Sequence, residues 1–412
     1  MSIKRIPMKA KEKNYKYSMK IAGKDYRGDS AEIYIPDTSL ALLSPPGRGK
    51  TVFITEHIKQ IATNREAVSI IFDAKAELYK KLYNPGDVIV SSKPISGYPV
   101  EIWNLFSEIY ADSNPILFAN ELTKMFFCDS IKKSQAPVFP TAASELFYGV
   151  IYAMIMDKQK PYNDELIAGL EKVSDARVRE IAKNNPELGG LNYLVAKNET
   201  AYSIRMELVS TLEKLFPLGS LYRAKGNFSV RNFVQNGKGK KLFVVFPFDE
   251  NESLSLITSV FIDLAMKEII SGPDLTKDDN TRFHIYLDEF SCLPEQLSYL
   301  TRVNDYGRSK GARITSGIQS YSQLERAYGE AGAQNILSSF NSLIAFKPND
   351  ETTRAKLRER CGKKSFTITP MCDVVAGGDV VTDMDLQGLG VAEAIMMLND
   401  IPPFFFDFYN AF

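Results

Sequence analysis

Cysteine is scarce in this sequence of 412 residues, and its four copies are widely separated. Cys128, Cys292, Cys361 and Cys372 form neither a CxxC pair nor the dense pattern of a disulfide scaffold. Structural disulfides belong to oxidising compartments and above all to small secreted domains. The sequence therefore excludes a disulfide framework and a cysteine-based metal knuckle, and it predicts a reducing, cytoplasmic setting.

Net charge is also absent, because 50 Lys and Arg residues balance 50 Asp and Glu residues. Such a chain has no global field that would draw it to nucleic acid or an acidic membrane, so any such contact must be local. The longest apolar runs, such as residues 147–156 and 242–248, fall short of the roughly 18 residues of a transmembrane helix. The lysine-rich start lacks the apolar core of a signal peptide. We therefore expect that the chain as given neither crosses a membrane nor is exported by its own signal.

The residues that are present describe a core-forming protein. Hydrophobic residues make up 44% of the chain and charged residues 24%, which excludes disorder and fibrous repeats. The length predicts about two to three domains. Apolar runs that predict strands alternate with helix-like segments, and they cover residues 32–35, 39–43, 68–72, 87–90, 242–246, 283–287, 312–316 and 342–346. This rhythm favours an α/β fold with a mostly parallel sheet that helices cover on both faces.

Two segments depart from this alternation of predicted strands and helices. Residues 105–220 have helical spacing almost throughout, which predicts an inserted all-helical domain at 105–225 within an α/β domain made of residues 31–104 and 226–412. Residues 1–24 carry eight Lys and Arg residues against one acid, without a period of 3.6 or 2. Residues 1–30 are therefore predicted to be a loosely ordered basic arm, either a solvated terminus or an electrostatic tether to lipid or DNA.

The clearest chemistry lies at residues 42–54, LLSPPGRGKTVFI, where a strand runs into a Gly- and Pro-rich turn and then an amphipathic helix. Backbone N–H groups in such a turn close on a phosphate where no Cβ intervenes, and the helix N-terminus adds its positive dipole end. Lys50 would bridge the β- and γ-phosphates of ATP, and Thr51 would bind Mg²⁺. The predicted nucleotide-binding residues are Ser44, Pro45, Pro46, Gly47, Arg48, Gly49, Lys50 and Thr51.

Ser44 departs from the phosphate-loop pattern GxxxxGK(S/T), which has glycine at this position. Serine adopts a glycine-only backbone conformation at a cost, so the loop entry is expected to be strained or differently turned. ATP binding is the preferred interpretation, and a decayed phosphate loop is the alternative.

A strand that ends in two acids supplies the second part of such a site. The run FHIYLDEF places Asp288 and Glu289 after apolar residues. Asp288 would complete the Mg²⁺ shell, and Glu289 would polarise the attacking water. Acidic pairs also end strands without any catalytic role, so the combination with Lys50 and Thr51 is what favours catalysis.

Two further polar residues flank the predicted strand at 312–316. Arg308 lies in the turn GRSKG before it, and Gln319 lies just after it. In ring ATPases such a turn carries an arginine to the γ-phosphate of the neighbouring subunit, an effect of about 10³- to 10⁵-fold in rate, and a polar residue after the strand senses that phosphate. A solvated basic turn and a capping glutamine are the alternatives.

Histidine is the scarcest titratable residue, with two copies in the chain. His57 lies on the helix that follows the phosphate loop, and His284 lies in the strand before Asp288. Both are predicted to be packing or surface residues, and not catalysts. The aromatic run at residues 404–409 is predicted to belong to the core or to an intersubunit contact, and not to a membrane element.

Several segments resemble one family in their order along the chain. IIFDAKAELYKKL, which begins at Ile70, is followed by YLDEF, by GRSKGARITSGIQSYSQLERAYG and by FKPNDETT. Together they resemble the TraG/TraD class of type IV secretion coupling proteins over most of residues 42–402, most specifically at 288–329. The resemblance implies a RecA-like P-loop ATPase that forms a homo-hexamer and uses ATP and Mg²⁺. It also implies that the protein brings single-stranded DNA with its relaxase, or protein substrates, to the channel components of a type IV secretion system.

The family's site residues carry over to this chain by position. Its Walker pairs fall on Lys50, Thr51, Asp288 and Glu289, with Thr51 and Asp288 as Mg²⁺ ligands. Its trans-acting arginine falls on Arg308, so the expected catalytic residues are Lys50, Glu289, Arg308 and Gln319. The family's Asp-Pro-Lys-Gly-Glu reads Asp-Ala-Lys-Ala-Glu at residues 73–77.

Two departures and two alternatives remain open. Coupling proteins usually begin with transmembrane helices, which this chain lacks before the phosphate loop. The sequence is therefore expected to be either a soluble form without these helices or a short form that relies on a membrane-anchoring partner at the cytoplasmic face of the inner membrane. Ser44 motivates a docking platform with weak or no hydrolysis, and an FtsK-like double-stranded DNA pump is the other alternative. A DNA pore needs only local positive charge. The basic residues expected to line it are Lys132, Lys133, Arg223, Lys225 and Arg231.

Overall fold

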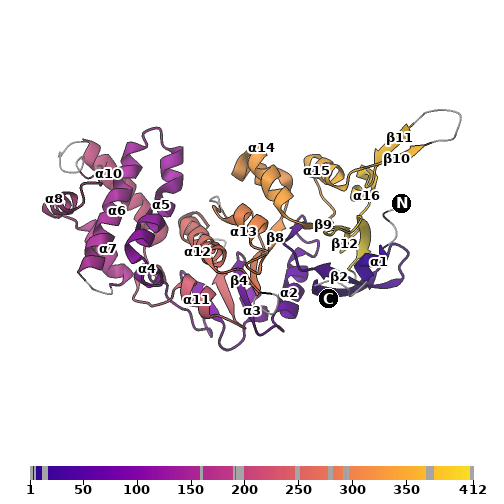
Figure 1. Cartoon of the computed structure of the whole chain (residues 1–412), viewed down its shortest axis with the longest axis horizontal. Coiled ribbons are helices and arrows are strands. Elements are labelled where there is room, and N and C mark those ends of the chain that lie inside the picture. The colour runs from indigo at the N-terminus through magenta and orange to yellow at the C-terminus, as the bar shows by residue number, and fades with distance from the viewer. Residues whose placement is uncertain are drawn as a thin grey trace. The chain divides into compact units, whose positions relative to one another are not determined.

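The computed structural model describes most of the chain, namely residues 3, 6–11, 17–157, 161–188, 191, 199–245, 251–276, 282–290, 293, 297–367 and 375–408. Contacts divide it into two compact units. The first comprises Met1–Asp87, Lys238–Lys241 and Ile269–Phe412, and the second comprises Val88–Gly237 and Leu242–Glu268 (Figure 1). The domain limits 31–104, 105–225 and 226–412 stay a prediction. Cys128 and Cys361 are free thiols. Cys292, Cys372, Phe246 and Tyr409 lie outside the described residues.

The first unit is built on a mixed sheet with the strand order β2-β1-β13-β12-β9-β3-β8-β7-β4. The five strands from β9 to β4 run parallel, whereas β12, β13, β1 and β2 pair antiparallel. The sequence thus predicts the parallel centre correctly. The strands are β1 Tyr17–Lys24, β2 Ser30–Pro36, β3 Leu40–Leu43, β4 Ala67–Asp73, β7 Arg282–Leu287, β8 Ala312–Ile318, β9 Ser342–Phe346, β12 Glu393–Met397 and β13 Phe404–Asp407. β10 Lys363–Thr367 and β11 Val375–Asp379 form a separate ribbon.

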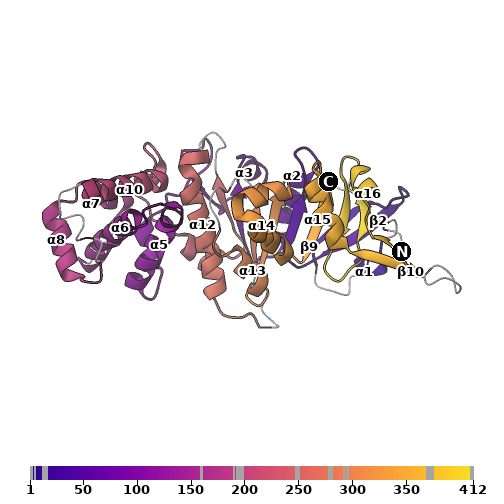
Figure 2. The same cartoon turned by 90° about the horizontal axis from the view of Figure 1, so that it is seen from above.

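Helices cover both faces of the parallel strands (Figure 2). The connection from β3 through α2 to β4 runs in one direction across the sheet, and the connections through α13 and α14 run in the other. Because such crossovers are right-handed, α2 lies on one face and α13 and α14 on the opposite face. The helices of this unit are α1 Met8–Lys11, α2 Lys50–Ile61, α3 Leu78–Leu82, α13 Leu300–Tyr306, α14 Tyr321–Ser339, α15 Glu351–Cys361 and α16 Asp383–Gln387.

Burial on both faces explains why the parallel strands read as continuous apolar runs. Ile70, Ile71 and Phe72 of β4 are fully buried. His57 and His284 pack together beneath α2, with ring centroids 6.0 Å apart. Burial lowers the pKa of each imidazole to about 3, so both rings are neutral packing residues, as predicted.

The prediction of a loosely ordered arm at residues 1–30 is wrong where the chain forms β1. This strand pairs with β2 along its length and with Asp407 of β13 at Lys24. Met19 and Ile21 are buried while Lys20 is exposed, so a short period of two is present. The lysines between the apolar residues obscured it, and Lys20 is neutralised across the strands by Glu32 at 2.7 Å.

The aromatic run near the C-terminus belongs to the core of the first unit. Phe404 and Phe406 of β13 are fully buried and Phe408 is 3% exposed. The Phe408 ring contacts Phe53 of α2 at 5.9 Å and Phe346 of β9 at 5.5 Å between centroids. The chain end after β13 therefore packs against α2, the helix that follows the phosphate loop.

The second unit is mainly helical. It also holds the parallel pair of β5 Val88–Ser91 with β6 Lys241–Val245. Its helices are α4 Leu105–Tyr110, α5 Pro115–Lys133, α6 Val138–Met156, α7 Asn163–Glu171, α8 Asp175–Asn184, α10 Glu199–Leu215, η1 Leu221–Arg223, α11 Val230–Asn236 and α12 Asn251–Ser271, whose last residues belong to the first unit.

The helix α6 is longer than its uninterrupted apolar run. Among the described residues it is the one helix that matches a membrane span in length and composition, with 19 residues and a mean hydropathy of 1.4. Phe147 at its centre is fully buried and meets Phe126 and Phe127 of α5 edge-on, at 5.7 and 5.9 Å between centroids. Here α6 is thus the core helix of the second unit.

Candidate nucleotide-binding site

The phosphate loop lies where the strand order reverses. β3 runs between β9 and β8, and ligands of open α/β sheets bind at the carboxyl ends of strands at such a switch point. Gly47 and Gly49 have φ values of 76° and 105°, a left-handed backbone that favours glycine. Gly49 is the N-cap of α2 and offers no side chain to its first amide groups. The loop therefore presents backbone N–H groups and a helix N-terminus to an anion.

Ser44 fits the loop without the expected strain. It is absent from the described non-glycine residues with positive φ, so its backbone is not left-handed. Its amide donates to the Ile318 carbonyl at 2.9 Å, and its buried hydroxyl donates to the Pro45 carbonyl at 3.0 Å. The serine thus ties the loop entry to the end of β8.

Lys50 and Thr51 each meet one member of the acidic pair. The Lys50 Nζ lies 3.1 Å from Glu289 Oε2, and both side chains are at most 7% exposed. The Thr51 hydroxyl donates to the Asp288 carboxylate, 3.1 Å from Oδ1 and 3.3 Å from Oδ2. The structure therefore brings these four predicted residues together at one edge of the sheet.

Negative charge is concentrated at this edge. Burial raises the pKa of Asp288, and Glu289 adds to the rise, while Lys50, the Thr51 hydroxyl and Lys75 oppose it. Burial likewise raises the pKa of Asp73 to about 6, and Asp288 contributes to that rise. Closely spaced, partly desolvated carboxylates favour a bound cation.

Two further residues, to which the sequence analysis assigned no role, lie close to these four side chains. Asp73 ends β4, and its two oxygens accept from the amides of Glu77 at 3.0 Å and Tyr79 at 2.9 Å. Gly317 lies in β8, where a Cβ would come within 2.2 Å of the Asp288 carbonyl oxygen and 2.7 Å of Lys50 Cδ. A glycine inside an otherwise apolar strand was the signal for this close approach.

The turn after β4 carries a strained residue. Ala76 has a φ of 54°, although alanine disfavours the left-handed region. The family pattern that the sequence resembles has glycine at this position. The turn nevertheless places the positive charge of Lys75 where it lowers the pKa of Asp288.

Arg308 and Gln319 lie at opposite ends of β8. Gln319 follows β8, whose Ile318 pairs with Leu43 at the end of β3, so it flanks the phosphate loop. Its Oε1 accepts from Gln323 Nε2 at 3.1 Å. Arg308 is exposed in the turn before β8. Because β8 and β3 are parallel, Arg308 is remote from Lys50 of its own chain.

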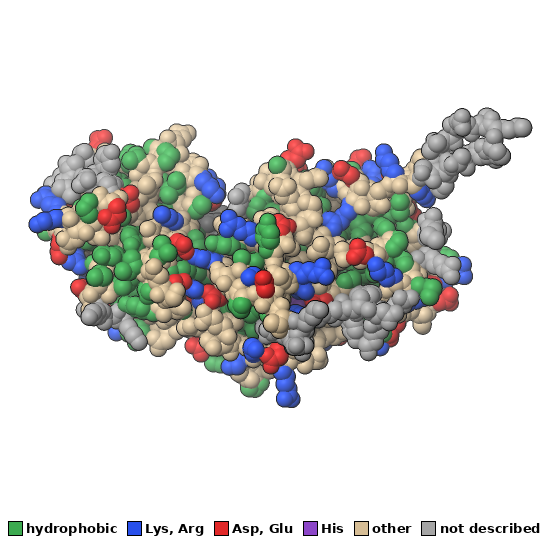
Figure 3. Space-filling model, in the orientation of Figure 1, with side chains coloured by type: hydrophobic (Ala, Val, Ile, Leu, Met, Phe, Trp, Pro, Cys, Tyr) green, Lys and Arg blue, Asp and Glu red, His purple; other side chains and the backbone are tan. Residues whose placement is uncertain are grey.

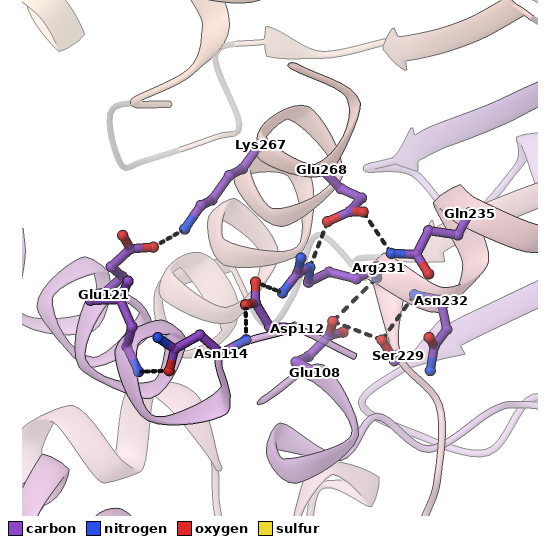
Figure 4. A network of polar contacts seen from close by, with 11 residues as sticks. Glu108, Asp112, Asn114, Glu121, Ser229, Arg231, Asn232, Gln235, Lys267 and Glu268 are labelled. Atoms are coloured by element: carbon purple, nitrogen blue, oxygen red, sulfur yellow. Dashed lines mark hydrogen bonds and ion pairs between the residues drawn. The ribbon is translucent and has the colours of Figure 1, made fainter. Parts of the chain in front are cut away.

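Arg231 is a correction to the predicted DNA contacts, because it is buried in an ion-pair network (Figure 4). Its Nη1 pairs with Asp112 at 2.8 Å and its Nε pairs with Glu268 at 2.6 Å. Its guanidinium also lies over the Phe118 ring at 4.3 Å from the centroid. A guanidinium held in this way is not available to a phosphate backbone.

The other four basic residues are more accessible. Lys132 and Lys133 end α5, and Lys133 pairs with Asp129. Arg223 donates to the Phe216 carbonyl, and Lys225 is exposed beside the Tyr162 ring. On the face drawn in Figure 3, basic and acidic side chains are interspersed, in keeping with a net charge of zero.

Comparison with known proteins finds similarity to type IV secretion coupling proteins. A family model described as the type IV secretion-system coupling protein DNA-binding domain matches residues 32–401. The coupling protein TraD of Escherichia coli (strain K12) is 24% identical over 369 residues, which are 86% of this chain and 49% of TraD. The coupling protein VirD4 of Bartonella henselae is 30% identical over 148 residues, 35% of this chain and 22% of VirD4. This chain thus spans about half the length of TraD.

Solved structures of a conjugative coupling protein share the fold. TrwBdeltaN70 in complex with sulphate has a TM-score of 0.75 at 19% identity, covering 98% of this chain and 92% of TrwBdeltaN70. TrwB in complex with ADP and Mg²⁺ has a TM-score of 0.72 at 20% identity, covering 90% of this chain and 84% of TrwB. The α/β, RecA-like fold predicted from the sequence is therefore confirmed. Since the family model covers most of the sequence, the chain belongs to the type IV secretion-system coupling protein family.

Proposed function

We propose that this chain is the ATP-hydrolysing part of a type IV secretion coupling ATPase. In this role it recruits single-stranded DNA with its relaxase, or another secreted protein, and moves it to the channel components at the expense of ATP. The active form is a homo-hexamer at the cytoplasmic face of the inner membrane, held there with a membrane-anchoring partner. Family membership and the geometry at the phosphate loop support this proposal.

One observation carries the proposal. Lys50 and Thr51, which begin α2, contact Glu289 and Asp288, which follow β7, although 237 or more positions separate them in the sequence. A buried lysine and a hydroxyl aimed at a pair of acids beside an open helix N-terminus is the arrangement that phosphoryl transfer requires.

The residues at this edge fit ATP and Mg²⁺. The left-handed backbone at Gly47 and Gly49 leaves the loop open to phosphate oxygens, and the Thr51 hydroxyl and the Asp288 carboxylate are hard oxygen ligands. No group of three or more His, Cys, Asp or Glu among the described residues forms a self-contained metal site. A magnesium ion held by Thr51 and Asp288 would take its remaining ligands from phosphate oxygens and water, as Mg²⁺ usually does.

Each residue then has a distinct role. Bound ATP with Mg²⁺ supplies the transferable phosphoryl group. Lys50 exchanges its contact with Glu289 for a contact with the phosphates, and this exchange frees Glu289 Oε2 to orient a water and accept its proton. Asp288 and Thr51 hold the cation, and Gln319 senses the terminal phosphate.

The helical segment at 105–225 is proposed as an inserted domain that meets the cargo. Lys132, Lys133, Arg223 and Lys225 are the DNA contacts that we retain from the sequence. A docking platform without hydrolysis is the alternative that Ser44 suggested. The relaxed backbone of Ser44 removes the observation that motivated it.

ATP hydrolysis with and without single-stranded DNA tests the proposal. We expect DNA to stimulate turnover, and the stimulation to fade between low and moderate salt because phosphate contacts release counterions. Glu289→Gln should keep ATP binding and lose about 10²- to 10⁴-fold in turnover. The control is Glu66→Gln, an exposed glutamate paired with Lys238. A hexamer without turnover, or a Glu289→Gln chain that hydrolyses ATP at the parent rate, would contradict the proposal.

A further inference from the structure

The helix α14 is broken near its middle, directly after a tyrosine. Gly329 has a φ of 71° and a ψ of 167°, a backbone conformation outside the helical range that is essentially limited to glycine. A Cβ added at Gly329 would meet no atom within 4 Å, so the backbone conformation and not a lack of space favours glycine there. Residues 321–328 therefore form a short helix of their own, which we call the first segment of α14.

The first segment of α14 begins beside the nucleotide site. Gln319 lies between the last residue of β8, Ile318, and the N-cap of the segment, Ser320. The Gln323 Nε2 in the first turn donates to Gln319 Oε1 at 3.1 Å. The residue to which we assign the sensing of the terminal phosphate is thus held by the helix that follows it.

The same segment ends beside the proposed general base. Tyr328 stacks on Phe290, with ring centroids 5.6 Å apart and ring planes inclined by 21°. Phe290 directly follows Glu289 in the chain and is 2% exposed. The Tyr328 hydroxyl also accepts a hydrogen bond from the Leu297 amide at 3.3 Å. Tyr328 therefore contacts the chain that follows Glu289 at two points.

The pairing of β7 with β8 explains why one short helix reaches both places. The two strands are parallel neighbours, and Leu287 of β7 lies opposite Ser316 of β8. The chain therefore leaves the sheet at Glu289 and at Gln319 side by side. The first segment of α14 connects these two exits, because Gln319 precedes its first turn and Tyr328 lies in its last.

The rest of α14 is attached to other helices. Gln334 accepts from Lys356 Nζ of α15 at 3.1 Å, and Ser339 accepts from Asn304 Nδ2 of α13 at 2.8 Å. The break at Gly329 lies between these contacts and the stacked ring of Tyr328. It allows the first segment to follow the nucleotide site while residues 330–339 follow α13 and α15.

We propose that Tyr328 is a positioning residue for Glu289, and that the first segment of α14 links Glu289 to Gln319. This inference rests on the proposed function and deepens it. Glu289 has to orient a water for attack, and a misplacement of about 1 Å in such a group can cost about 10²-fold in rate. The stacked ring of Tyr328 fixes Phe290 and thereby the backbone of Glu289. Tyr328 thus acts through Glu289, and not by contact with the nucleotide.

Turnover and ATP affinity of Tyr328→Leu test the proposal, because leucine keeps an apolar side chain but removes the stacked ring. We expect kcat to fall about 10- to 100-fold while the Kd for ATP changes less than about threefold. Tyr328→Phe keeps the ring and should retain most of kcat. The matched control is Tyr306→Leu, because Tyr306 is 69% exposed at the end of α13. Unchanged kcat in Tyr328→Leu, or an equal loss of kcat and ATP affinity, would overturn the proposal.

Combination with Glu289→Gln separates positioning from a general loss of structure. If Tyr328 acts through Glu289, adding Tyr328→Leu should not lower the residual turnover of the Glu289→Gln chain further. A further loss by the same factor as in the wild-type background would show that Tyr328 acts independently of Glu289. A wild type that binds ATP without turnover contradicts the proposed function and this inference together. An active wild type beside an equally active Tyr328→Leu chain contradicts this inference alone.

Discussion

The two units bury carboxylates in opposite ways. In the second unit, Glu108 is fully buried and accepts hydrogen bonds from Trp103 Nε1 and Ser229 Oγ, each at 2.8 Å, as well as from backbone amides. In the first unit, Asp73, Asp288 and Glu289 gather at one strand edge where Lys50 is the buried cation.

The difference separates a stabilising network from a ligand site. Burial raises the pKa of Glu108, and its four donors oppose that rise, so the carboxylate is fully satisfied inside the protein. Burial alone would lower the pKa of Arg231, but Asp112 and Glu268 raise it above its ordinary value. At the nucleotide site, burial raises the pKa of both Asp73 and Asp288, and the neighbouring acids Asp288 and Glu289 respectively raise it further. A region that folds with unbalanced charge is prepared for a ligand that restores the balance.

Removing Arg231 should have the largest effect on stability. Arg231→Met leaves Asp112 and Glu268 without their common cation, and breaking a buried ion pair in this way costs about 3–5 kcal/mol. Hydrogen exchange of amides in α4 and α12 measures the loss within the second unit. Lys225→Met is the control, because Lys225 is exposed. Equal protection of both variants would show that the network does not stabilise this unit.

Titration of Asp73 should make the free energy of unfolding depend on pH, with an effect smaller than that of Arg231→Met. Its folded pKa of about 6 lies above its ordinary value of 3.8, so folding favours the protonated form. The free energy of unfolding should therefore fall as the pH rises from 4 to 6, by roughly 2–3 kcal/mol from this group. Urea unfolding of the wild type and of Asp73→Asn across this range measures the difference. Parallel pH profiles would show that the pKa of Asp73 is not raised in the folded chain.

Ala76→Gly should have the smallest effect and the opposite sign. Relief of the left-handed backbone should stabilise the nucleotide-free chain by about 1 kcal/mol. Ala74→Gly is the matched control, because Ala74 is buried and lacks a positive φ, so that change should destabilise the chain. The urea concentrations at half-unfolding of the two variants and the wild type measure both changes in stability. A destabilised Ala76→Gly chain would show that its backbone stores no strain.

The parallel half of the sheet could be predicted because local sequence determines it. Each of its strands is a continuous apolar run buried on both faces, and the phosphate loop and the acidic pair directly follow two of them. Most of the antiparallel half was missed because its apolar residues are few or interrupted by lysines, as in β1, and because one of its pairings is long-range. β13 joins β1 across nearly the whole chain, and no turn signal connects them.

Side-chain partners were the least predictable part of the site. Arg231 was expected to contact DNA like Arg223 and Lys225, yet it pairs with acids 119 and 37 positions away. Composition counts charges, whereas the fold determines which of them are neutralised. The same limit applied to Gly317, whose need for glycine depends on Lys50 and Asp288.

Equilibrium binding of ATP most directly tests whether the buried acids of the first unit form a ligand site, unlike the ion-pair network of the second unit. Titration calorimetry compares the wild type with and without Mg²⁺ and with Lys50→Ala. If the acidic edge of the first unit is a nucleotide site, Mg²⁺ strengthens ATP binding and Lys50→Ala weakens it at least tenfold, which is about 1.4 kcal/mol. ATP binding that is indifferent to both Mg²⁺ and Lys50 would contradict the account.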